Sequence, residues 1–177
     1  MNQGTDANEE RERLLRCLRL KRVVRSGWTR FPIENPESVA AHSWGMGLLA
    51  LLTCPPELDR EKVITLALIH DLAEVIVGDI TPLDGVPEEE KRQQEEKALS
   101  ILLQGHPRSE ELQSIWQEFE DRTTPEGKFV SDLDKLDMGL QADIYEQDFD
   151  INLSEFTVSS RRRVMHPILS SLLKPLE

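Results

Sequence analysis

Helical periodicity runs through almost the whole chain of 177 residues and limits the possible folds more than any other feature. Apolar residues recur three and four positions apart in long segments, and this spacing puts them on one face of a helix. These segments are 13–24, 36–54, 59–79, 87–105, 109–123 and 124–147, with a weaker one at 159–176. No segment shows the strict alternation of a half-buried strand. The sequence therefore predicts an all-α fold of six or seven helices.

No internal repeat or low-complexity linker divides the chain, so we expect a single compact multi-helix domain over residues 1–177. The longest irregular stretches lie at about 26–36, 78–87 and 148–158. The last of these separates a core at about 14–147 from a C-terminal helical tail at about 158–177. A chain of this length can bury a sufficient core without disulfides or structural zinc.

Composition excludes several classes of protein. The chain is 38% hydrophobic and 31% charged, and no apolar stretch approaches the roughly 18–20 residues of a membrane span. The N-terminal segment lacks the basic stretch and apolar core of a secretory signal. Cys17 and Cys54 form no CxxC pair and are typical of a reducing compartment. We therefore expect a cytoplasmic protein that does not enter membranes.

The net charge of −12 argues against nucleic-acid binding, which needs a basic face. The charge is unevenly spread, because 84–121 is strongly acidic while basic residues gather between 11 and 30. The basic residues are Arg11, Arg13, Arg16, Arg19, Lys21, Arg22, Arg25 and Arg30. A solvated helix face explains most of them, but a small anionic ligand could bind near this segment.

Two of the four histidines lie in successive predicted helices. His42 lies in 36–54, and His70, directly followed by Asp71, lies in 59–79. A lone histidine in an apolar helix is more often a hydrogen-bonded core residue. Two such residues, one joined to an aspartate, favour a divalent metal site instead, since imidazole nitrogen and carboxylate oxygen are common ligands of such ions.

More acidic residues follow the His-Asp doublet. Glu74 lies four residues after His70, on the same helical face, and Asp79 directly follows the expected end of the helix at Gly78. The segment 59–79 itself begins at a candidate N-cap residue, Asp59.

The segment 124–147 supplies three further aspartates. Asp134 and Asp137 flank its apolar stripe and can face the interior, whereas Asp132 is expected to face solvent. Spacing alone does not choose between Asp134 and Asp137 as a metal ligand.

Taken together, "RSGWTR…NPESVAAHSW", "IHDLAEVIVGDITP" and "KFVSDLDKLDMGLQADIYE" resemble the HD superfamily of metal-dependent phosphohydrolases in order and spacing. The resemblance covers roughly residues 14–147 and is nearest to the HD-domain 5′-deoxynucleotidases, which release phosphate from deoxynucleoside monophosphates. It implies an HD-type helical domain, a metal-dependent phosphomonoesterase that acts through a metal-activated water, a small nucleotide substrate and a homodimer. The amphipathic, leucine-rich first helix and the C-terminal tail could pack against a second copy in such a dimer.

The resemblance also implies roles for particular residues. The metal ligands would be His42, His70, Asp71 and Asp134, around one divalent ion. Manganese, cobalt, zinc, iron, nickel and magnesium all remain open as the identity of that ion.

Glu74 and Asp79 match the acids that the family uses near the attacking water and the substrate phosphate, without an assignment of acid and base between them. Arg25 and Trp28 match its substrate-contacting arginine and tryptophan.

The match is loosest in this substrate segment. Two residues separate Arg25 from Trp28, whereas some family members place the arginine directly before the tryptophan, so Arg30 or Arg22 could fill the arginine role. Trp28 is also consistent with a core or lid residue. Trp44 and Trp116 occupy helical positions typical of packing.

Three other functions stay open from the sequence. The same scaffold could act on another phosphoester, such as a cyclic nucleotide, a nucleoside triphosphate or an alarmone. It could be a catalytically silent module that senses nucleotides, although Glu74 and Asp79 argue against a purely structural metal site. Finally, the His-Asp pair could be a buried salt bridge in a helical interaction protein.

Overall fold

The computed structural model describes residues 7–173 and 175, so part of the expected tail at 158–177 lies outside the described residues. The all-α prediction is confirmed, because the described residues form α-helices and short 3-10 helices, with one isolated bridge and no strand. The α-helices are α1 Ala7–Leu18, α2 Val39–Thr53, α3 Arg60–Ile69, α4 Glu74–Val77, α5 Glu88–Leu103, α6 Ser109–Asp121, α7 Pro125–Phe149, α8 Ser154–Arg163 and α9 Pro167–Ser171. The 3-10 helices are η1 Arg19–Arg22, η2 Ser26–Arg30 and η3 Pro82–Asp84.

Side-chain caps begin the three helices that build the interior. The Ser38 side chain accepts a hydrogen bond from the Ala41 amide at the start of α2, and Asp59 accepts one from the Lys62 amide at the start of α3. Thr124 caps α7 in the same way. The predicted cap at Asp59 is thus confirmed, and each such cap stabilises its helix by about 1 kcal/mol.

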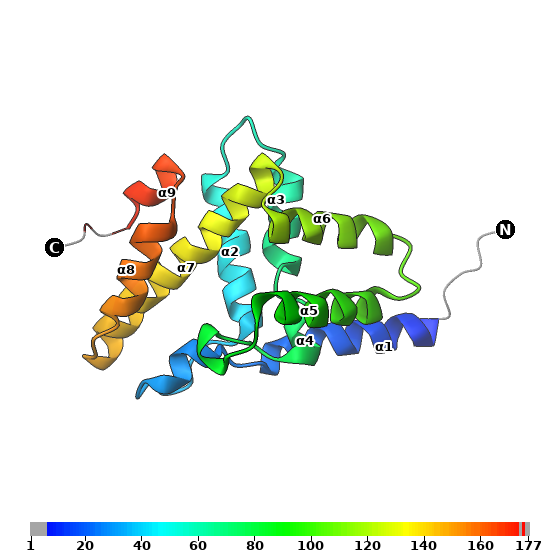
Figure 1. The fold of residues 1–177 in the computed structure, drawn as a ribbon, viewed down its shortest axis with the longest axis horizontal. Helices are drawn as coiled ribbons and strands as arrows, with labels where there is room; N and C mark the ends of the chain where they lie inside the picture. Colours follow the sequence, from blue (N-terminus) through cyan, green and yellow to red (C-terminus); the bar gives the residue numbers. More distant parts are fainter. Residues whose placement is uncertain (1–6, 174, 176–177) are drawn as a thin grey trace.

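The main core forms where α7 crosses α2 and α3. The α7 stripe of Phe129, Leu133 and Leu136 is buried against Met46 of α2 and Leu66 of α3. In Figure 1, α7 runs through the middle of the molecule, with α2 and α3 on one side and α8 and α9 on the other. Each of these buried side chains contributes roughly 1.5–3 kcal/mol of hydrophobic stabilisation. None of the described helices is both long and apolar enough to cross a membrane.

The prediction of one continuous helix over 59–79 is wrong. Helix α3 ends at Ile69, and turns occupy residues 70–73 before the short α4. The indole Nε1 of Trp116 donates to the carbonyl oxygen of His70 at 2.9 Å and gives it a partner outside the helix. The break leaves His70 and Asp71 at a helix end, where both side chains can face one point. Gly78 ends α4 with φ of 80°, as the sequence predicted.

The prediction of a helix over 13–24 is also wrong. Helix α1 ends at Leu18, η1 follows, and the chain then pairs with the segment before α2 through an antiparallel bridge between Val24 and Ser38. The Arg25 amide donates to the Glu37 carbonyl at 3.0 Å. This pairing places Arg25 beside the segment that leads into α2. The expected irregular stretch at 148–158 is shorter than predicted, because α8 begins at Ser154.

Candidate metal centre and substrate cavity

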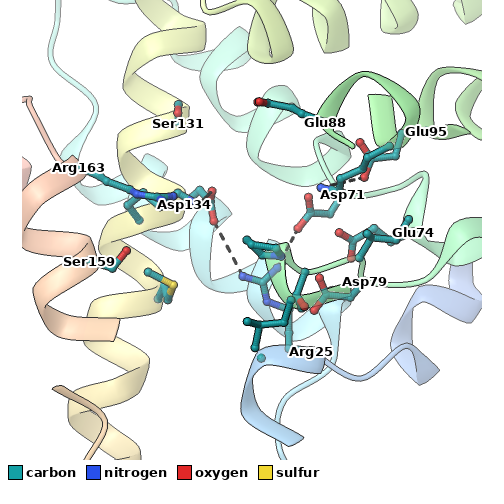
Figure 2. Close-up of a pocket in the computed structure, with 18 of the residues that line it drawn as sticks. Arg25, Asp71, Glu74, Asp79, Glu88, Glu95, Ser131, Asp134, Ser159 and Arg163 are labelled. Atoms are coloured by element: carbon teal, nitrogen blue, oxygen red, sulfur yellow. Dashed lines mark hydrogen bonds and ion pairs between the residues drawn. The ribbon is translucent and has the colours of Figure 1, made fainter. Parts of the chain in front are cut away.

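A cavity of about 800 Å³ opens between two walls of the molecule. One wall is formed by α7 and α8, which carry Asp134 and Ser159, and the other by the segment from the end of α3 to α5, which carries Asp71 and Glu74 (Figure 2). Arg25 reaches in between the two walls from the segment before α2. Small-molecule sites typically have volumes of roughly 300–1,000 Å³.

Hydrogen bonds orient both imidazoles of the cluster. His42 Nδ1 lies 2.7 Å from the Asp137 carboxylate, and His70 Nδ1 lies 3.0 Å from the Ala67 carbonyl oxygen. Because both partners are acceptors, each Nδ1–H must donate. The two Nε2 atoms then face each other 3.3 Å apart, and each is left to bind a proton or a cation.

Two carboxylates complete the cluster. Asp71 Oδ2 lies 3.0 Å from His70 Nε2 and 3.6 Å from His42 Nε2, while Asp134 Oδ1 lies 3.5 Å from His42 Nε2. Two imidazole nitrogens and two carboxylates fit a divalent transition metal in type and in charge. The structure gives the two α7 aspartates different places, since Asp134 faces the Nε2 side of His42 and Asp137 its Nδ1 side.

The Arg25 guanidinium lies at the edge of this cluster. Its Nη1 is 3.3 Å from Asp71 Oδ2, and its Nη2 is 4.0 Å from Asp134 Oδ1. Burial disfavours the charged guanidinium, but the two carboxylates outweigh that effect and raise the pKa of Arg25. Burial likewise opposes ionisation of Asp71 and Asp134, yet the neighbouring cationic groups hold the pKa of both carboxyls below its usual range.

Glu74 is a buried carboxyl on the wall of the same cavity. It is 2% exposed, and its Oε2 has no hydrogen-bond partner among the described residues. Burial raises its pKa to about 10, with repulsion from Asp71 and Asp79 adding to the shift. A carboxyl in such surroundings can take up or release a proton near neutral pH once its electrostatic surroundings change, which suits acid-base chemistry.

Asp79 lines the cavity and also anchors the segment that carries Arg25. Its Oδ2 accepts from the Ser26 amide at 2.7 Å, and its carbonyl oxygen accepts from the Ser26 hydroxyl at 2.8 Å. One carboxylate oxygen is therefore committed to the backbone next to Arg25. The other is the atom through which Asp79 could act on a substrate.

Trp28 is mainly a core residue. It is 2% exposed, its Nε1 donates to Glu37 at 2.8 Å, and its ring packs edge-on against Tyr145 at 5.2 Å. Part of the side chain still lines the cavity. The predicted contact between Trp28 and the substrate stays a prediction. Only the part of the side chain that lines the cavity could make it.

The three arginines proposed for the phosphate role lie in different surroundings. Arg25 faces the cluster, whereas Arg30 is exposed at the cavity rim, 3.5 Å from Glu155, with its guanidinium over the Phe156 ring. Arg22 is exposed in η1 and is not part of the cavity lining. Because Arg25 is the nearest of the three to the cluster, the structure favours it for the phosphate-binding role.

Sequence reasoning missed two lysines that line the cavity. Lys135 Nζ lies 2.7 Å from Asp134 Oδ2, and Lys91 Nζ lies 3.2 Å from Glu95 on the opposite wall. Lys135 could have been found, since it directly follows the proposed ligand Asp134. Nothing in the sequence around Lys91 points to the cavity.

The other two histidines and Asp132 lie outside the cavity. His106 and His166 are not among its lining residues, and the His166 ring instead packs against Phe129. Asp132, expected to face solvent, accepts hydrogen bonds from the backbone amides of Met165 and His166 just before α9. Neither histidine belongs to a group of possible metal ligands among the described residues.

Trp44 and Trp116 differ although both were predicted to pack. Trp116 is 1% exposed beneath the α3 break, and the prediction is confirmed there. Trp44 is 67% exposed on α2, so within this chain it packs against little.

Comparisons with known proteins agree with this architecture. A family model described as HD domain matches residues 17–174. The chain is 41% identical over 172 residues to 5′-deoxynucleotidase HDDC2 of Mus musculus, covering 93% of this chain and 86% of that protein. It is 41% identical over 168 residues to 5′-deoxynucleotidase hdd1 of Schizosaccharomyces pombe, covering 90% and 84%.

A solved structure described as a conserved hypothetical protein from Pyrococcus furiosus has the same fold. It superposes with a TM-score of 0.75 at 34% identity and covers 91% of this chain and 97% of that one. All residues of the histidine-aspartate cluster lie inside the matched family region. The chain therefore belongs to the HD domain family, and within it to the group of the HDDC2-type 5′-deoxynucleotidases.

Proposed function

We propose that the chain is a metal-dependent phosphomonoesterase that releases phosphate from deoxynucleoside 5′-monophosphates. One observation carries the proposal: at the cavity wall, Asp71 and Asp134 meet the buried Nε2 atoms of His42 and His70 beside the Arg25 guanidinium. This arrangement could hold one divalent cation next to a phosphate-binding arginine. The Mus musculus and S. pombe relatives, both named 5′-deoxynucleotidases, support the substrate class.

The side chains of the cavity have distinct tasks in this proposal. When bound, a divalent cation supplies Lewis-acid charge at the phosphoryl oxygens and makes water a better nucleophile. Arg25 holds the phosphate with its planar guanidinium and fixes the phosphorus in line for attack. Phosphoryl transfer needs little covalent participation by the protein, so positioning and charge stabilisation supply most of the acceleration.

Two acidic residues, Glu74 and Asp79, take part in proton transfer in this proposal. Glu74 has an unpartnered carboxyl oxygen at the cavity wall. A bound cation would favour its ionised form, in which it can accept a proton from the attacking water. Asp79 keeps Arg25 in place through Ser26, and its second carboxylate oxygen is available for the leaving 5′-oxygen or for a donor to it. The departing nucleoside alkoxide needs a proton, and the proton that Glu74 takes from the attacking water can supply it, directly or relayed through water or Asp79.

The proposal is tested by measuring phosphate release from chelator-stripped protein. The substrates are matched deoxynucleoside and ribonucleoside 5′-monophosphates, with cobalt, manganese, magnesium or zinc restored separately. We expect release only with an added metal, and faster release from the deoxy forms. Absence of release from every monophosphate with every metal would contradict the proposal.

We also propose that two copies associate through an exposed face of α2. Trp44 and Leu52 are 67% and 71% exposed, and Leu48 and Leu51 continue the same apolar face. Sedimentation should show a dimer that Leu52→Glu dissociates, while Met165→Glu, at another exposed apolar side chain, leaves it intact. A monomeric wild-type protein would contradict the dimer.

We place the protein in the cytoplasm. The unpaired thiols of Cys17 and Cys54 support this proposal, because such thiols are typical of a reducing compartment. Fractionation of cells with an antibody against the chain tests it. Recovery in a secretory or organelle fraction would contradict it.

A further inference from the structure

We propose that Asp137 is a positioning residue that makes Nε2 of His42 the metal-binding atom, and that Gly45 is required to make room for the Asp137 carboxylate. The inference rests on the proposed function, because it concerns the same metal centre. It assigns roles to two residues outside the proposed set of metal ligands. Both roles follow from the packing of α7 against α2.

The first observation is the hydrogen bond behind His42. Its Nδ1 lies 2.7 Å from Asp137 Oδ2, and the imidazole is fully buried, with no solvent to replace that partner. A carboxylate accepts only, so the proton must sit on Nδ1 in the neutral ring, and the lone pair must sit on Nε2. Nε2 is the atom that faces Asp71 and Asp134.

The second observation is the space left by Gly45. A Cβ built on this residue would lie 2.6 Å from Asp137 Oδ1, a distance at which something must shift. The α2 helix thus lacks a side chain where the carboxylate passes. Gly47, two residues along the same helix, meets only Leu68 at an ordinary 3.4 Å. The two glycines therefore differ in what a methyl group would displace.

The third observation concerns Glu37, which has a ligand atom within 4.8 Å of His42 and of Asp137. Its carboxylate oxygen accepts from Trp28 Nε1 at 2.8 Å, and its backbone amide donates to Tyr145. These contacts hold Glu37 in the aromatic cluster and leave Asp137 as the hydrogen-bonding partner of His42. Asp137 alone, rather than Asp137 together with Glu37, is therefore favoured as the residue that positions His42.

Zinc affinity, measured by competition with a chromophoric chelator, tests the inference without using activity. We expect Asp137→Ala to weaken zinc binding by about 10–100-fold, the usual effect of removing the partner of a ligating histidine. Asp137→Asn, whose amide oxygen can still accept, should fall between Asp137→Ala and wild type. Asp148→Asn, an exposed aspartate on the same helix, is the matched control and should leave affinity unchanged.

The glycine pair provides an independent test if Asp137→Ala fails to fold. Gly45→Ala should weaken zinc binding, while Gly47→Ala, with the same methyl added to the same helix, should not. A long-range proton-nitrogen spectrum of the histidines should also show His42 protonated at Nδ1 in zinc-loaded wild type. Loss of that signal in Asp137→Ala would separate a positioning role from general stability.

Unchanged zinc affinity in Asp137→Ala, or equal effects of the two glycine variants, would overturn the inference. So would a zinc-loaded His42 protonated at Nε2. Failure of the proposed function looks different: wild-type protein would bind zinc tightly, with the expected dependence on Asp137, and release no phosphate from any nucleotide. The two ideas can therefore fail separately.

Discussion

The two sides of the cavity are built from different kinds of backbone. On the metal side, His42 in the first turn of α2 and Asp134 within α7 project from long, capped helices whose other faces form the core. His70 and Asp71 directly follow α3, which packs in the same core. On the substrate side, Arg25 sits at the start of a 3-10 helix that is tied to α2 by one bridge and to Asp79 through Ser26. The metal side is therefore fixed by packing, while the substrate side depends on a few hydrogen bonds.

This difference separates two requirements of a phosphatase site. Ligands need positions that are accurate before anything binds, and buried helices supply them. A phosphate-binding arginine has to adapt as the substrate enters, and Arg25 is held by a few hydrogen bonds and ion pairs, although Trp28 in the same segment is packed in the core. Mutations on the metal side should thus abolish activity, whereas mutations on the substrate side should lower it by smaller, varying amounts.

The largest effect is expected on the metal side. His70→Ala should lower kcat/KM by on the order of 10³-fold or more, because the cation supplies several kcal/mol of transition-state stabilisation. Metal content per chain should fall in parallel, as measured by elemental analysis of dialysed protein. His106→Ala, outside the cavity, is the control. Activity retained by His70→Ala without bound metal would show that the cluster is not the catalytic centre.

The next effect tests whether Glu74 acts in proton transfer. Glu74→Gln keeps the shape but removes the titrating oxygen, so kcat should fall by about 100-fold. The free energy of unfolding of chelator-treated protein should not decrease, because the substitution removes a buried, unpartnered carboxyl oxygen. Urea denaturation measures this. Glu88→Gln, an exposed acid on the same cavity, should change neither quantity, and an equal loss of kcat there would exclude a special role for Glu74.

On the substrate side, Arg25 and Arg30 should differ sharply. Arg25→Ala should lower kcat/KM by about 100-fold, since it removes charge stabilisation of the phosphate. Arg30→Ala should change it less than about threefold, because an exposed arginine paired with an exposed acid contributes little. Steady-state kinetics on one deoxynucleoside monophosphate compares the two. A larger loss of kcat/KM in Arg30→Ala than in Arg25→Ala would indicate that the phosphate binds at the cavity rim instead.

The smallest effect should come from the tether of the substrate segment. Ser26→Ala removes the hydroxyl that donates to the Asp79 carbonyl, so KM should rise roughly three- to fivefold with kcat nearly unchanged, as one hydrogen bond is worth about 1 kcal/mol. Thr29→Val removes a comparable local hydrogen bond in the same 3-10 helix and serves as control. If Thr29→Val raises KM equally, the effect belongs to the segment in general rather than to the Asp79 tether.

Part of the metal side was predictable from sequence, because His42 and the α7 aspartates lie in helices with clear periodicity. The apolar stripe of α7 placed Asp134 and Asp137 at its edges, and both do face inward. Periodicity alone left the choice between them open, because it cannot show which side of His42 each aspartate meets. The resemblance to HD proteins selected Asp134 as the ligand, and that selection stays a proposal.

Other features depended on contacts between distant segments. The break at His70 involves the Trp116 indole, which arrives from a helix 46 residues later. The position of Arg25 depends on a bridge and on Asp79, neither of which has a local signal. Trp44 matched a packing position within its helix, but no element of the described chain covers it. Local sequence patterns cannot predict such contacts between distant segments.

Anomalous diffraction from a cobalt-loaded crystal tests the central claim most directly. We predict one strong peak at roughly 2.0–2.2 Å from His42 Nε2, His70 Nε2 and a carboxylate oxygen each of Asp71 and Asp134. The Asp137 carboxylate should remain on the Nδ1 side of His42, outside the coordination sphere. A peak instead between Glu37, His42 and Asp137, the other group of possible ligands, or none near His42, would contradict the account.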